Sequence, residues 1–92
     1  MSNLMITVNG VEQYRTTIAM GSDMNARRVT KAAYDICHQG PAGAPTPGVA
    51  VYVRTTRGGW EHRVIVKKGG RYYTRVGSYL DLAQRAANPC AA

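Results

Sequence analysis

The sequence predicts an α+β domain in which one long and one short helix pack on one face of an antiparallel β-sheet. Apolar and polar residues alternate in five segments, which is the two-residue period of half-buried strands. Between the second and third segments, apolar residues recur at helical spacing instead. With 92 residues, 45% of them apolar, the chain has enough apolar surface for one core, so we expect a single domain over residues 1–92.

An N-terminal hairpin is expected to open the domain. Residues 4–8 and 11–19 form its strands, and Asn9-Gly10 joins them. Both turn residues tolerate the positive φ that a two-residue hairpin loop requires.

The long helix is expected next, from about Met24 to Gln39, with Ser22 or Asp23 as its N-cap. Residues 40–48 hold three prolines and three glycines and no charge. This composition excludes a helix or a central strand, so the segment is predicted to be a loop that returns the chain to the sheet. An exposed contact loop is the alternative.

A three-stranded meander is expected to complete the sheet. Its strands are residues 49–56, 60–67 and 71–76, and the glycine pairs Gly58-Gly59 and Gly69-Gly70 mark its turns. The N-terminal hairpin either extends this meander or packs apart from it.

A short C-terminal helix follows the meander. Ser78 opens it in a sequence similar to a capping box, with Asp81 in place of the usual Glu. Asn88-Pro89 ends it, and residues 89–92 are expected to form a mobile tail.

The chain is strongly basic. Twelve Lys and Arg against five Asp and Glu give a net charge of +7, and +6 of this falls on residues 49–92. Such a chain attracts polyanions, namely nucleic acid, anionic lipid or an acidic protein surface.

Cations and tyrosines of the meander are predicted to share the sheet face opposite the helices, while the valines and Trp60 face the helices. Guanidinium groups bind phosphates, and tyrosine rings stack on unpaired bases. A solvated face without a ligand is the alternative. The predicted nucleic-acid-binding residues are Tyr52, Arg54, Arg63, Lys67, Lys68, Arg71, Tyr73 and Arg75.

A second cluster of cations is expected on the long helix. Arg27, Arg28 and Lys31 are predicted to contact a partner or to extend the basic face. A solvated helix face explains them equally well. Lys31 and Asp35 are four residues apart and are expected to form a weak ion pair.

Residues capable of catalysis form no pattern. Cys37, His38, His62 and Cys90 lack the spacing of metal ligands, and Cys37 is expected to be a small buried residue. We therefore expect no enzyme, metal, cofactor or small-molecule substrate. The chain has no run of about 18 apolar residues and no secretory signal, so we expect no membrane association and a cytoplasmic location.

Three stretches carry a resemblance to a known family. They are Met1-Ser2-Asn3-Leu4-Met5-Ile6-Thr7-Val8, Arg27-Arg28-Val29-Thr30-Lys31 and Val64-Ile65-Val66-Lys67-Lys68-Gly69-Gly70-Arg71-Tyr72-Tyr73. Through them, and by overall likeness, the chain resembles the phage-encoded anti-CRISPR proteins of the type I-F group. The resemblance implies a non-enzymatic inhibitor in the cytoplasm of the infected bacterial host. Its partners would be protein subunits and guide RNA of the type I-F CRISPR surveillance complex, which it would stop from binding target DNA.

The positive charge decides how such an inhibitor would act. At +7 the chain cannot imitate DNA, so the expected mode is a basic face lying against the guide RNA and blocking its pairing with the target. A free-standing regulator that binds DNA or RNA is the alternative, and a structural phage protein with an incidental basic face is a third interpretation.

Overall fold

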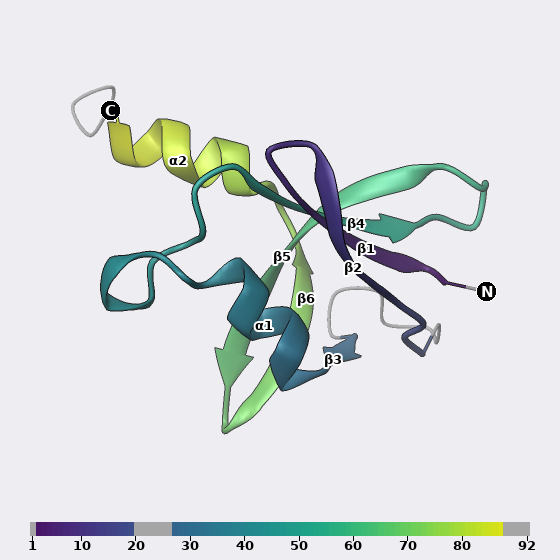
Figure 1. Cartoon of the computed structure of the whole chain (residues 1–92). Coiled ribbons are helices and arrows are strands. Elements are labelled where there is room, and N and C mark those ends of the chain that lie inside the picture. Colours follow the sequence, from purple (N-terminus) through teal and green to yellow (C-terminus); the bar gives the residue numbers. More distant parts are fainter. Residues whose placement is uncertain (1, 20–26, 88–92) are drawn as a thin grey trace.

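The computed structural model describes residues 2–19 and 27–87 (Figure 1). They form one antiparallel half-barrel sheet of six strands and two α-helices, which confirms the predicted α+β class. The order of strands across the sheet is β2-β1-β4-β5-β6-β3, so the N-terminal hairpin extends the meander. The elements are β1 (Leu4–Val8), β2 (Val11–Thr16), β3 (Arg28–Val29), α1 (Lys31–Cys37), β4 (Val49–Arg54), β5 (Trp60–Lys68), β6 (Arg71–Val76) and α2 (Tyr79–Ala87).

The predicted N-terminal hairpin forms, although its second strand ends at Thr16 and not at residue 19, and it contains a β-bulge. Asn9 and Gly10 adopt φ angles of 53° and 81°, so the two-residue turn forms. Thr7 lies opposite Glu12, whereas the preceding Ile6 lies opposite Tyr14. One residue of β2 is therefore extra, which breaks the strict alternation expected over residues 11–19.

The predicted meander is confirmed, and its middle strand is divided between two neighbours. β5 pairs with β4 from Trp60 to Arg63 and with β6 from Arg63 to Lys68. Arg63 therefore has a partner on both sides, Val51 on β4 and Val76 on β6.

The long helix is shorter than predicted and begins later. Arg28 and Val29 form β3 and pair with Tyr73 and Tyr72 at the edge of β6. The hydroxyl oxygen of Thr30 then accepts a 3.3 Å hydrogen bond from the backbone N–H of Ala33 and caps α1. At residues 28–29, strand pairing thus replaces the helix that was expected there. The predicted caps Ser22 and Asp23 lie outside the described residues.

α1 packs against β5 and β6 (Figure 1). Ala33 and Cys37 are fully buried in the hydrophobic core, as expected for Cys37. On the same helix Tyr34 stacks on His38, with ring centroids 4.0 Å apart, and contacts Tyr72 of β6 at 4.7 Å. These contacts fix the helix on the concave side of the sheet.

The loop over residues 40–48 is held to the end of α1. The Thr46 hydroxyl donates a 2.6 Å hydrogen bond to the carbonyl of Ile36 and accepts a 2.9 Å bond from the N–H of Gln39. The loop contains only a single 3₁₀ turn, over Pro41–Gly43. It connects the helix to β4, as predicted.

α2 is anchored by its first residue. The side chain of Ser78 accepts a 3.2 Å hydrogen bond from the N–H of Leu80, at the predicted helix start. The buried Tyr79 hydroxyl accepts a 2.9 Å bond from the N–H of Ile65 and donates a 3.2 Å bond to its carbonyl. Ile65 lies beyond the last residue of β5 that pairs with β4. Tyr79 therefore satisfies backbone groups that have lost their neighbouring strand. The expected tail at residues 89–92 lies outside the described residues.

Tyr79→Phe tests this anchor. The change leaves the N–H and carbonyl of Ile65 without the hydroxyl, so we expect the free energy of unfolding to fall by about 1–3 kcal/mol. Urea denaturation measures it. Tyr52→Phe is the control, because its ring lines an open groove, and a change within about 0.5 kcal/mol is expected there. Equal stability of Tyr79→Phe and the wild type would contradict the role of the hydroxyl.

Candidate nucleic-acid interface

The strand registers define two faces of the sheet. Side chains of directly paired residues point to the same face, and neighbours along one strand point to opposite faces. The inner face carries the buried core residues of β1 and β4, including Leu4, Ile6, Val51 and Val53. We call the opposite side the outer face.

Four exposed cations and a tyrosine share one end of the outer face. Lys68 lies opposite Arg71, Val64 lies opposite Arg75, and Tyr73 lies opposite Val66 on one side. On its other side Tyr73 pairs with Arg28 of β3. We call Arg28, Lys68, Arg71, Tyr73 and Arg75 the basic face. The four cations are exposed and Tyr73 is half-buried. Lys68, Arg71, Tyr73 and Arg75 are among the predicted nucleic-acid-binding residues. Arg28 was predicted to lie on the long helix instead.

The other end of the outer face is aromatic. The guanidinium carbon of Arg54 lies 4.7 Å from the ring centroid of Trp60, and that of Arg15 lies at 5.8 Å. Next to them the rings of Tyr52 and His62 are 4.6 Å apart. Trp60 therefore does not face the helices as predicted, but shares the face of Tyr52 and Arg54. Cation–π contact holds Arg54 against the indole.

The predicted face is wrong for Arg63 and Lys67. Arg63 lies on the inner face opposite Val51, is 2% exposed, and forms a 3.3 Å ion pair with Glu61. Lys67 is exposed but pairs with Tyr72 on the side away from Tyr73. The cause is the turn before β5. Arg54 pairs directly with Trp60, so the even-numbered residues of β4 and β5 share one face and the odd-numbered residues share the other.

The predicted helix cluster is also divided. Arg27 is 5% exposed and donates a 2.7 Å hydrogen bond from Nη1 to the carbonyl of Ala19, so it is not available as a surface contact. Lys31 is the first residue of α1 and forms the predicted ion pair with Asp35 at 3.1 Å. Only Arg28 joins the basic face.

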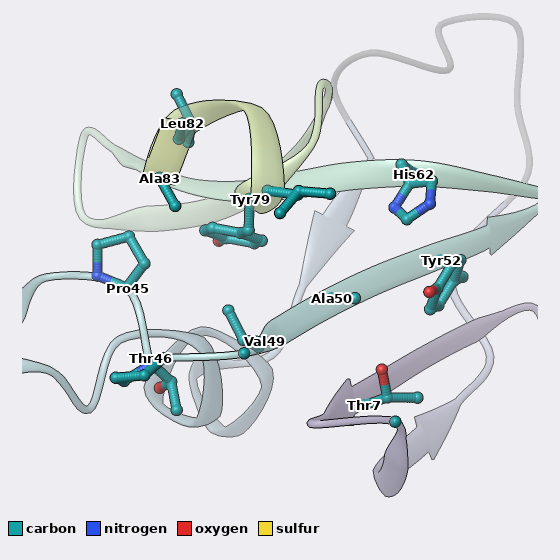
Figure 2. Close-up of a pocket in the computed structure, with 14 residues that line it drawn as sticks. Thr7, Pro45, Thr46, Val49, Ala50, Tyr52, His62, Tyr79, Leu82 and Ala83 are labelled. Atoms are coloured by element: carbon teal, nitrogen blue, oxygen red, sulfur yellow. The ribbon is translucent and has the colours of Figure 1, made fainter. Parts of the chain in front are cut away.

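An apolar groove of about 690 Å³ lies between α2, the loop before β4 and the outer face of β4 and β5. Figure 2 shows Pro45 and Leu82 on one side of it, with Ala50, Tyr52 and His62 along the strands. Leu80 and Leu82 of α2 are 65% and 37% exposed. Sequence reasoning missed this groove because its walls come from three separate segments.

The chemistry of the remaining reactive groups is limited. Burial raises the pKa of the Cys37 thiol from 9.0 to about 12, so the thiol stays protonated at neutral pH. Within residues 2–19 and 27–87, no three His, Cys, Asp or Glu side chains form a cluster able to hold a metal ion. No helix in this part of the chain is long and apolar enough to cross a membrane.

Comparisons with protein families, with curated proteins and with solved structures found no match for the chain.

Arg63→Glu separates the structural role of Arg63 from the predicted ligand contact. A second carboxylate beside Glu61 on the buried face removes the ion pair, so we expect a loss of about 3–5 kcal/mol in the free energy of unfolding. Lys67→Glu makes the same charge change at an exposed position of the same strand, and about 0.5 kcal/mol or less is expected. Chemical denaturation of both variants measures the difference. Equal stability of the two variants would contradict the placement of Arg63.

Proposed function

We propose that the protein binds single-stranded RNA along its basic face, and that it inhibits the type I-F CRISPR surveillance complex by covering the guide RNA. The observation that carries the proposal is the convergence of Arg28, Lys68, Arg71 and Arg75 around Tyr73 on three adjacent strands. A sheet face with cations around an aromatic ring suits a strand whose bases are unpaired, because phosphates and bases both find partners.

The distribution of ion pairs supports an anionic ligand at this place. Three ion pairs join described residues, and they use Arg15, Lys31 and Arg63. Within the described part of the chain, none of the four cations of the basic face has an acidic partner. Their charge is therefore available to phosphates.

The inhibitory step follows from the ligand. Target recognition by an RNA-guided complex depends on base pairing between its guide and the target strand. A protein lying on the guide would prevent this pairing without any chemical step. The resemblance to type I-F anti-CRISPR proteins and the charge of +7 both agree with this mode.

The test compares two charge-matched double variants. Lys68→Glu with Arg75→Glu reverses two cations of the basic face, and Arg57→Glu with Lys67→Glu reverses two exposed cations outside it. Both variants have a net charge of +3. In pull-downs from cells carrying a type I-F system, we expect the first variant to recover complex and guide RNA at least about tenfold less efficiently, because each charge-assisted hydrogen bond contributes about 1.5–3 kcal/mol. The second is expected to match the wild type.

Two outcomes would contradict the proposal. If both folded variants recover the complex as the wild type does, the basic face is not the contact surface. If the wild type binds naked RNA as tightly as the assembled complex, with a steep salt dependence, the protein is a free-standing regulator. Circular dichroism checks that each variant is folded.

A further inference from the structure

The two outermost strands of the sheet approach each other at a seam. β2 and β3 lie at opposite ends of the strand order, yet the hydroxyl of Tyr14 is 3.0 Å from the Oγ1 of Thr30. Beside this contact, Arg27 bonds the carbonyl of Ala19, in the segment that follows β2. Figure 1 shows β3 near the end of β2. The curvature of the half barrel thus brings together residues 16–19 and 27–31.

A groove of about 490 Å³ follows this seam. Three cations line it, Arg28, Lys31 and Arg71, and the threonines at positions 16, 17 and 30 add hydroxyl groups. None of the described residues that line it is acidic. The Lys31–Asp35 pair lies at the surface, where the two side chains are 71% and 53% exposed, so it binds Lys31 only weakly.

The groove is continuous with the basic face. Arg28 and Arg71 belong to both, because Arg28 pairs with Tyr73 and Arg71 lies two residues from Tyr73 on β6. Such diagonal neighbours on one face have their Cβ atoms about 7–8 Å apart, within reach of two arginine side chains. Gly70, with φ of 75°, lies in the turn beside Arg71 and lines the groove. The absence of a side chain there allows a ligand to approach the backbone.

We propose that the seam groove binds a backbone phosphate of the RNA strand that lies along the basic face. This inference rests on the proposed function and adds a defined contact to it. Arg28 and Arg71 offer paired N–H donors that match phosphate oxygens, and Lys31 adds a point charge. The bound strand would then run from the seam, past Tyr73, towards Arg75.

Tyr14 acts as a positioning residue for this site. Its hydroxyl contacts Thr30 across the seam, and Tyr14 is not one of the cations that would contact a phosphate. Tyr14→Phe should therefore widen the groove and weaken RNA binding without changing the number of phosphates neutralised. The expected signature is a lower affinity with an unchanged dependence on salt. Urea denaturation checks that the variant is as stable as the wild type, because a loss of folded protein would lower the apparent affinity in the same way.

The experiment measures binding of fluorescein-labelled oligouridine by anisotropy over a range of salt concentrations. The seam variant is Arg28→Gln with Arg71→Gln, and the matched face variant is Lys68→Gln with Arg75→Gln. We expect both variants to lose at least about tenfold in affinity, and the slope of log affinity against log salt to fall by about 0.7 for each phosphate contact removed. Tyr14→Phe should lose affinity at an unchanged slope.

The failures of the two proposals are distinguishable. If only the face variant loses affinity, the seam groove binds no phosphate while the proposed function stands. If neither variant loses affinity, both proposals are wrong. Inorganic phosphate and vesicles of anionic phospholipid are titrated as further arms. Vesicle binding that exceeds oligouridine binding and is lost in the seam variant would assign the groove to a lipid headgroup and overturn the inference.

Discussion

β5 hydrogen-bonds to β4 over its first four residues and to β6 over its last six, and this division of one strand decides which side chains meet. The turn on each side sets the register. Arg54 pairs directly with Trp60 across the first turn, and Lys68 pairs with Arg71 across Gly69-Gly70. A slip of one residue in either turn would exchange the two faces of a strand. The basic face is therefore a consequence of turn geometry as much as of composition.

The division of β5 also creates groups that must be satisfied. Where β4 stops pairing, Tyr79 bonds the backbone of Ile65 from α2. At Arg63, β5 changes its pairing partner from β4 to β6. The Arg63 side chain is buried there and forms an ion pair with Glu61. Because β4 and β6 pair with different halves of β5 and the sheet is curved, the outermost strands come together at the seam. The fold and the proposed binding site thus depend on the same strand.

Structural features that depend on residues close together in the chain could be predicted from the sequence. The Asn9-Gly10 turn, the three strands of the meander and the start of α2 at Ser78 follow from turn residues, alternation and capping. Strand pairing between segments that are distant in the chain could not be predicted from these local patterns. Residues 28–29 fall within the predicted helix and nevertheless form β3, because the edge of β6 offers Tyr72 and Tyr73 as partners. Trp60 and Arg63 were placed on the wrong faces, since alternation along a strand does not give the register between strands.

The most direct test of the account uses two adjacent tyrosines on opposite faces of β6. Tyr73→p-azidophenylalanine and Tyr72→p-azidophenylalanine place the same photoreactive ring on the basic face and on the inner face, where Tyr72 contacts Tyr34. Each variant is irradiated in the presence of the type I-F surveillance complex. We expect a crosslink to guide RNA from position 73 and none from position 72. A crosslink from position 72 alone, or from neither position while both variants still bind the complex, would contradict it.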